Sequence, residues 1–236
     1  MGNKILNNID IRTKELIVDS LNNSAELFKD FKMQTPFNTT HNCYPSARWD
    51  SINETLSDSL RKCNFPFAVT KKGFWALLLF CDSKKEIVFS AMRRDRFEYI
   101  CDNPEKNAPQ YFDALVSLND GLEAKVSQMR LDDCYEATDK YNQLDNLCKL
   151  LPTPSNDKFT HAVVVFDIFY DDITSIKLYI VNNRFEVVEE EDIIDSVIKS
   201  RIPLVIPDES PDTHDEDTTK RKGLVSLKKN VQISQA

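Results

Sequence analysis

Residues 74–82 read Phe-Trp-Ala-Leu-Leu-Leu-Phe-Cys-Asp, and residues 161–170 read His-Ala-Val-Val-Val-Phe-Asp-Ile-Phe-Tyr. Each apolar run is followed by a short polar turn and a second apolar run, which is the pattern of a β-hairpin. The tripeptide Arg-Phe-Glu comes next in both places, at residues 96–98 and at residues 184–186. These paired segments predict two hairpins at the centre of a sheet.

The first hairpin is apolar on both faces. A four-residue turn over residues 82–85 places Leu78 opposite Phe89 and Phe80 opposite Ile87. Strands that carry apolar residues on both faces are typical of the middle of a sheet, where helices cover each side. We therefore expect the first hairpin to be central and buried on both faces.

The second hairpin alternates, because the even-numbered residues over 162–170 are all apolar while the odd-numbered residues are mixed. Matching the apolar faces of its two strands requires a three-residue loop over residues 171–173. That register pairs Phe166 with Leu178 and places Asp167 directly opposite Lys177. We expect this hairpin to be buried on one face.

Helical periodicity surrounds both hairpins, with apolar residues three and four positions apart. It predicts helices over residues 10–31, 51–63, 94–101, 109–129, 137–151 and 189–200. The expected fold class is α+β, in which antiparallel hairpins form a central sheet with helices packed on it. The expected domain covers residues 1–206. A duplication would divide it into αββα halves, 1–105 and 106–206, and convergence of common strand patterns is the alternative.

Composition excludes several classes of protein. The 236 residues carry a net charge of −8, which argues against a general nucleic-acid coat. With four glycines, the chain lacks the Gly-rich loops of dinucleotide enzymes and P-loop NTPases. No apolar run approaches the roughly 18 residues of a membrane span, and no leader opens the chain. Six scattered cysteines without a Cys-x-x-Cys pair indicate reduced thiols, so we expect a cytoplasmic protein with no membrane partner.

Asp167 and Lys177 are the candidate catalytic residues. An acid and a lysine on adjacent strands are similar to the Mg²⁺-binding core of a restriction-type nuclease. Ser175, however, stands where that core needs its second carboxylate. A cross-strand ion pair explains the same register without catalysis, and we favour that interpretation. The histidines share no ligand spacing, so we expect neither a metal nor a cofactor.

An arginine patch is the candidate ligand-binding site. Arg93, Arg94 and Arg96 end the first hairpin, and Arg184 holds the corresponding position after the second. Guanidinium groups bind phosphate and carboxylate in a fork geometry, so the cluster is suited to an anion. The alternative is a solvated network of ion pairs with neighbouring acids.

The run from Trp75 to Arg96 contains the strand patterns Leu-Leu-x-Phe-x-Asp and Phe-x-x-Met, and Tyr-x-Asp-Ala-Leu follows at residues 111–115. In these motifs the chain resembles an uncharacterised family of low-GC bacterial and phage proteins that has no assigned activity. The resemblance implies a small accessory protein carried by mobile elements or defence loci, and it transfers no catalytic residue.

Together these observations favour a non-catalytic protein-interaction or regulatory protein whose partner is another protein. A defence or counter-defence role is what the resemblance implies. The alternative is a metal-dependent nuclease or RNA-binding factor that uses Asp167, Lys177 and the arginines.

Residues 207–236 are strongly charged, with an acidic run followed by a basic one, and predict a mobile tail. Limited proteolysis should then remove this segment first. The melting temperature of the remaining protein should stay within about 2 °C of that of the full chain. A segment that stabilised the domain by as little as about 1 kcal/mol would lower the melting temperature by several degrees when removed. A larger fall, measured by calorimetry on the purified fragment, would show that the segment docks on the domain.

Overall fold

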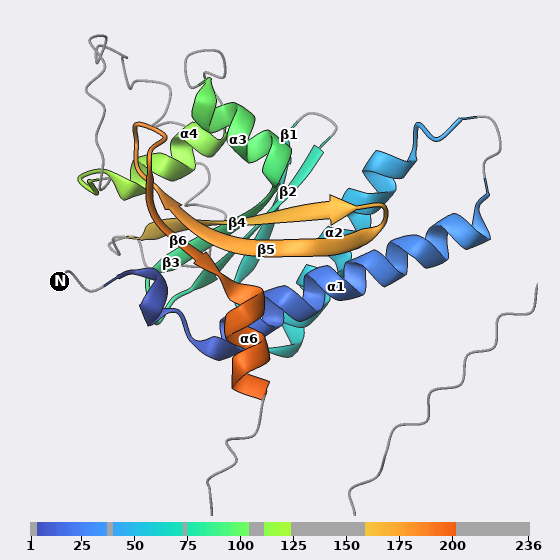
Figure 1. Ribbon diagram of the computed structural model, residues 1–236, viewed down its shortest axis with the longest axis horizontal. Coiled ribbons are helices and arrows are strands. Elements are labelled where there is room, and N and C mark those ends of the chain that lie inside the picture. Colours follow the sequence, from blue (N-terminus) through green and yellow to red (C-terminus); the bar gives the residue numbers. More distant parts are fainter. Residues whose placement is uncertain (1–3, 37–39, 73–74, 104–110, 124–158, 202–236) are drawn as a thin grey trace, which may run out of the picture. The chain divides into compact units, whose positions relative to one another are not determined.

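The computed structural model describes residues 4–36, 40–72, 75–103, 111–123 and 159–201, all of which belong to the unit Met1–Ile202. Within this unit a six-stranded sheet has the order β1-β2-β3-β4-β5-β6, and helices cover both of its faces (Figure 1). The expected α+β class is confirmed. The expected helix over 137–151 and the charged segment over 207–236 lie outside the described residues.

The sheet consists of two antiparallel three-stranded meanders joined by one parallel pair, β3 with β4. The expected hairpins are β2–β3 and β4–β5, and they occupy the centre of the sheet. The two edge strands, β1 and β6, were not expected. The strands are β1 (Phe67–Lys72), β2 (Trp75–Asp82), β3 (Ile87–Arg93), β4 (Thr160–Phe169), β5 (Asp172–Val181) and β6 (Val187–Asp192).

The described helices are α1 (Ile11–Gln34), α2 (Tyr44–Lys62), α3 (Arg94–Asp102), α4 (Tyr111–Val116) and α6 (Ile193–Arg201), with 3₁₀ turns η1 (Leu6–Asn8) and η3 (Ser117–Asn119). Helices α1 and α3 confirm the helices expected over residues 10–31 and 94–101. Helix α2 begins before the expected Ser51, because Pro45 suits a first turn. Ser51 instead lies inside the helix, where its hydroxyl donates to the Ala47 carbonyl.

Two expected helices were wrong in extent. The helix over 109–129 stops at Val116, because Asn119 donates to the carbonyls of His161 and Val181 and accepts from the His161 amide. Gly121 then turns the chain at a φ of +80°. The final helix begins at Ile193 and not at residue 189, since Asp192 accepts the Ile194 amide and ends β6.

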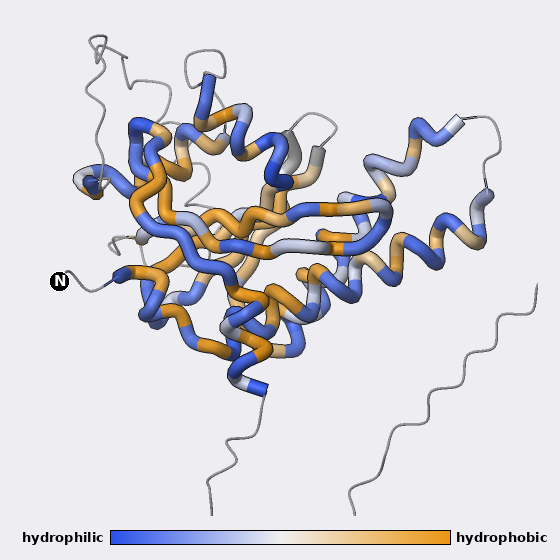
Figure 2. Tube along the Cα trace, viewed as in Figure 1, coloured by the Kyte–Doolittle hydropathy of each residue, from blue (hydrophilic) through white to orange (hydrophobic). Residues whose placement is uncertain are grey.

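Two cores lie on opposite faces of the sheet. On one face α1, α2 and α6 pack against Ala162, Val164 and Phe166 of β4. On the other face α3 and α4 pack against Val163 and Val165. Strand β4 is therefore buried on both faces over residues 161–166, so the expectation of a one-sided second hairpin was wrong for this strand. Strand β5 alternates as expected, with Ile176, Leu178 and Ile180 buried. Figure 2 shows hydrophobic residues concentrated in the central strands, with hydrophilic residues returning at the β4–β5 turn.

Both hairpin registers differ from the expected ones by two residues. Phe80 lies opposite Phe89, and Phe166 lies opposite Ile176. The faces stay as expected, because a slip of two residues returns each side chain to its own side. In the first turn the Asp82 carboxylate accepts the amides of residues 84 and 85, which lengthens the strand before the turn. In the second, a bulge follows Asp167.

The repeated Arg-Phe-Glu tripeptide occupies two different local structures. Residues 96–98 lie in α3, whereas residues 184–186 form the β5–β6 turn. In that turn Asn182 accepts the amides of Arg184 and Glu186. Phe185 has a φ of +64° there, a conformation that no helix contains. The likeness of the two tripeptides therefore does not extend to their conformation.

His161 is a buried titratable group beneath α4. Its Nε2 lies 2.9 Å from the Ser90 hydroxyl, and its ring and that of Phe112 form a T-shaped pair at a centroid distance of 5.7 Å. Burial lowers the pKa of His161 to about 3, from an ordinary value of 6.5. The folded protein thus holds a neutral imidazole through most of the acid range.

Acidification should therefore destabilise the fold through His161. Between pH 6.5 and 3 the unfolded chain binds a proton that the folded chain does not, so stability falls as the pH falls, by about 1.4 kcal/mol per unit from this group. Urea unfolding at pH 8 and pH 5 measures how much free energy of unfolding each protein loses on acidification. That loss should be about 2 kcal/mol smaller in His161→Gln than in the parent. Equal acid losses in the two proteins would contradict the assignment.

Candidate functional site

The structure does not place Asp167 opposite Lys177. Asp167 pairs with Ser175 in the sheet, and Lys177 pairs with Val165. The Asp167 carboxylate forms an ion pair with the Nε of Arg94 at 2.9 Å, and the same guanidinium donates to Ser175. Lys177 instead binds Glu190 of β6 at 2.6 Å. The expected acid–lysine pair is thus replaced by two separate ion pairs.

The four candidate arginines are not brought together. Arg93 ends β3 beside Phe166, whereas Arg184 follows β5 near the opposite end of the strands, where Ile180 pairs with Ala162. Arg93 forms an ion pair with Asp95 at 3.2 Å. Arg96 lies over the ring of Tyr99 at 5.4 Å. The chain changes from strand to helix at Arg94. The side chains of Arg93 and Arg96 on either side of it therefore point in different directions.

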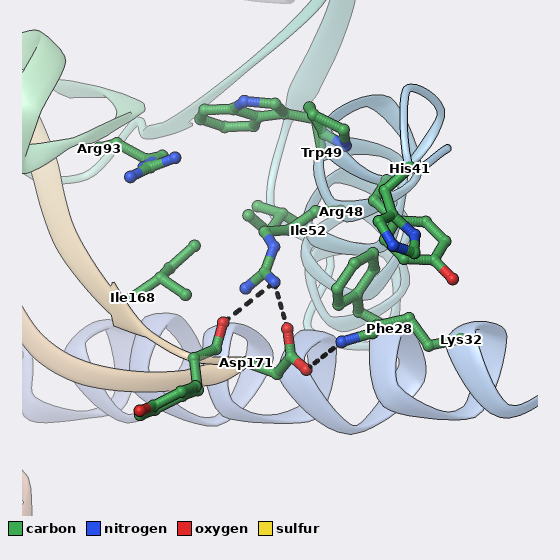
Figure 3. Close-up of a pocket in the computed structure, with 12 residues that line it drawn as sticks. Phe28, Lys32, His41, Arg48, Trp49, Ile52, Arg93, Ile168 and Asp171 are labelled. Carbon is green, nitrogen blue, oxygen red and sulfur yellow. Dashed lines mark hydrogen bonds and ion pairs between the residues drawn. The ribbon is translucent and has the colours of Figure 1, made fainter. Parts of the chain in front are cut away.

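Arg93 does, however, reach a cavity of about 370 Å³ between α1, α2 and the β4–β5 turn (Figure 3). A volume of this size lies within the range of small-molecule sites. The lining combines basic, aromatic and aliphatic side chains from segments that are distant in sequence. They are Phe28, Lys32, His41, Tyr44, Pro45, Arg48, Trp49, Ile52, Arg93, Ile168, Tyr170 and Asp171.

Asp171 is the central ionic group of this pocket. Its carboxylate accepts hydrogen bonds from Lys32 of α1 at 2.6 Å and from Arg48 of α2 at 2.5 Å. Arg48 also donates to the Tyr170 carbonyl at 3.3 Å. Figure 3 shows Arg48 and Lys32 converging on Asp171. Burial alone would raise the pKa of Asp171, but the two cations outweigh it and lower the pKa. One ionised carboxylate therefore joins the turn to both helices.

Aromatic rings form one wall of the pocket and hold its cations. The Arg48 guanidinium lies 4.1 Å from the centroid of Phe28, a cation–π contact. His41 stacks on Tyr44 at a centroid distance of 4.8 Å. Trp49, half-buried, meets Phe166 edge to face at 5.7 Å. Planar groups are thus presented close to fixed positive charges.

The pocket is positively charged although the chain is acidic. Its lining contains Lys32, Arg48 and Arg93 against the single carboxylate of Asp171. Charges in a partly enclosed site attract more strongly than charges on an open surface, because less water screens them. The arrangement is therefore suited to an anion, as the sequence suggested for Arg93, although the other contributing cations were not expected.

Within the described ranges, no group of three or more His, Cys, Asp and Glu side chains has the geometry of a metal site. In that same part of the chain, no helix combines the length and apolarity that crossing a bilayer requires.

Comparison with known families identifies the chain over nearly its whole length. Residues 6–235 match the Family of unknown function (DUF5986), so the chain belongs to that family. This confirms the expected membership in an uncharacterised family. No curated protein and no solved structure matches the chain.

The role of Asp171 can be tested against its neighbour. Asp171→Asn leaves Arg48, whose side chain is 19% exposed, without its carboxylate, and should lower the free energy of unfolding by about 1–3 kcal/mol. Asp172→Asn removes an ion pair with Lys29 in which the carboxylate is 64% exposed, and should cost less than about 1 kcal/mol. Urea denaturation measures both, and equal losses would show that Asp171 does not fasten the turn.

Proposed function

We propose that this family member is a non-catalytic protein-interaction or regulatory protein, and that it contacts a partner protein at the tip of the β4–β5 hairpin. The observation that carries the proposal is a pair of aromatic side chains at that tip. Phe169 is 66% exposed and Tyr170 is 84% exposed. Their rings meet edge to face at a centroid distance of 4.6 Å.

The tip is exposed and also firmly held. Asp171 and Asp172, which follow the aromatic pair, bind Lys32 and Lys29 of α1. Aromatic residues that are fixed before binding lose little conformational freedom in a complex, so they contribute strongly to affinity.

The composition of this end of the domain resembles that of protein interfaces. Tyr, Phe, Met and Arg are enriched in the contact regions of proteins, whereas Lys and Glu are depleted. Phe169 and Tyr170 match that composition, and the ion pairs around Asp171 would form a polar rim. A partner with an apolar surface would cover the aromatic pair.

For the cellular compartment and the kind of genetic locus, the proposal relies on what the sequence indicates. We place it in the cytoplasm, where reduced cysteines persist, and in the accessory or defence loci of bacterial mobile elements and phages that the family resemblance implies. The nuclease alternative gains no support from Asp167 and Lys177, since each is bound by a different partner.

Position-specific crosslinking in cells tests the proposal. A photoreactive benzoyl-phenylalanine replaces Tyr170 in one protein and the exposed Arg184, at the other end of the strands, in a control. Quantitative mass spectrometry should recover a defined protein from the first and not from the second. With that protein purified, Phe169→Ser should weaken binding at least about tenfold, because the aromatic anchor is lost. The same proteins recovered from both positions, or none above background, would contradict the proposal.

A further inference from the structure

The cavity beside the hairpin tip has two guanidinium groups directed into it. Arg48 projects from α2, and Arg93 projects from the end of β3. In Figure 3 the Arg93 guanidinium extends toward Arg48, into a space that has Trp49 on one side and Ile168 on the other. Arg93 is 45% exposed, so it can approach a ligand that enters from solvent.

Charge around this space remains unbalanced after the known ion pairs are counted. Among the lining groups, three cations (Lys32, Arg48 and Arg93) oppose one carboxylate (Asp171), which leaves an excess of two positive charges. Asp95, which pairs with Arg93 but does not line the cavity, reduces that excess to one. An anion placed between the guanidinium groups would receive charge-assisted hydrogen bonds from both sides.

The walls indicate more than a bare anion. An inorganic anion would fill a small part of the 370 Å³, and the remainder is bordered by Trp49, Tyr44, His41 and Ile168. Flat aromatic side chains stack on nucleobases, and this stacking is worth about 1–3 kcal/mol per base in nucleic-acid sites. The pocket therefore has one part suited to a phosphate and another part suited to a planar ring.

We propose that this cavity is a binding site for a mononucleotide, with the phosphate between Arg48 and Arg93 and the base against Trp49. The proposal does not rest on the partner protein: Phe169 lies outside the cavity lining, whereas the exposed Tyr170 borders both the cavity and the proposed contact surface. A nucleotide in this position would touch α2, the end of β3 and the base of the hairpin at once.

Ligand titration of the full chain tests the site. In a Trp75→Phe background, Trp49 is the only tryptophan of the chain, so its fluorescence reports on the pocket. The 5′-monophosphates of adenosine, guanosine, cytidine and uridine are titrated separately, beside the nucleosides and inorganic phosphate, with calorimetry as a second measurement. At least one nucleotide should bind saturably, and about tenfold more tightly than its nucleoside or phosphate alone.

Arg93→Gln and Arg184→Gln form a matched pair, because each removes one positive charge from an exposed arginine but at opposite ends of the strands. Arg93→Gln should weaken nucleotide binding about tenfold or more, whereas Arg184→Gln should leave it within about twofold. Circular dichroism and thermal melting of both variants establish that each is folded.

Several results would overturn the assignment. They are no saturable binding of any nucleotide at about 5 mM, phosphate binding as tightly as the nucleotides, or equal affinity in Arg93→Gln and Arg184→Gln. None of these results bears on the loss of partner binding in Phe169→Ser, because Phe169 does not line the cavity, so the nucleotide site and the protein interaction can fail separately.

Discussion

The parallel pairing of β3 with β4 is the constraint on which the rest of the described structure depends. Seven consecutive residue pairs, from Ile87 with Thr160 to Arg93 with Phe166, join the two antiparallel meanders. The pair is buried on both faces, so helices before β1 and helices between β3 and β4 both have an apolar surface to cover. Parallel strands require a long connection, and α3 and α4 lie on that connection.

The same pairing builds the pocket. Arg93 stands beside Phe166 at the end of the paired segment, and Trp49 packs on that phenylalanine from α2. Strand β4 continues beyond its parallel partner and turns at Tyr170 and Asp171, where the ion pairs with α1 and α2 begin. A rigid sheet end and two helices therefore surround a space that no single element encloses.

The sequence predicted the faces of the central strands better than their registers. Alternation over residues 162–170 identified the core side of β4, because an apolar residue on the wrong face would meet water. It could not show that the Asp82 carboxylate would bind backbone amides in the turn, or that a bulge would follow Asp167. Those local bonds moved both hairpins by two residues and separated Asp167 from Lys177. The end of the edge strand β6 was mistaken for the start of a helix, since glutamate favours helices and is depleted in strands.

The candidate pocket was largely invisible in the sequence, because its lining comes together only through the packing of α1, α2 and the hairpin tip. Arg93 was the one member that a local cluster of arginines revealed. Its neighbours in that cluster, Arg94 and Arg96, bind Asp167 and Tyr99, since a strand followed by a helix sends consecutive side chains in divergent directions. Arg48 and Asp171 stand 123 positions apart, a distance over which no spacing rule operates.

The acidic strand β6 has a consequence for how the molecule meets copies of itself. Its carboxylates are directed to separate anchors: Glu189 accepts the amides of Ile5 and Leu6, Glu191 binds the buried Lys14, and Glu190 binds Lys177. A sheet edge is an open template for another strand, and fixed charges along it make that addition costly. By fastening the N-terminal segment with the same residues that charge the edge, the fold opposes growth of the sheet into fibrils at this side.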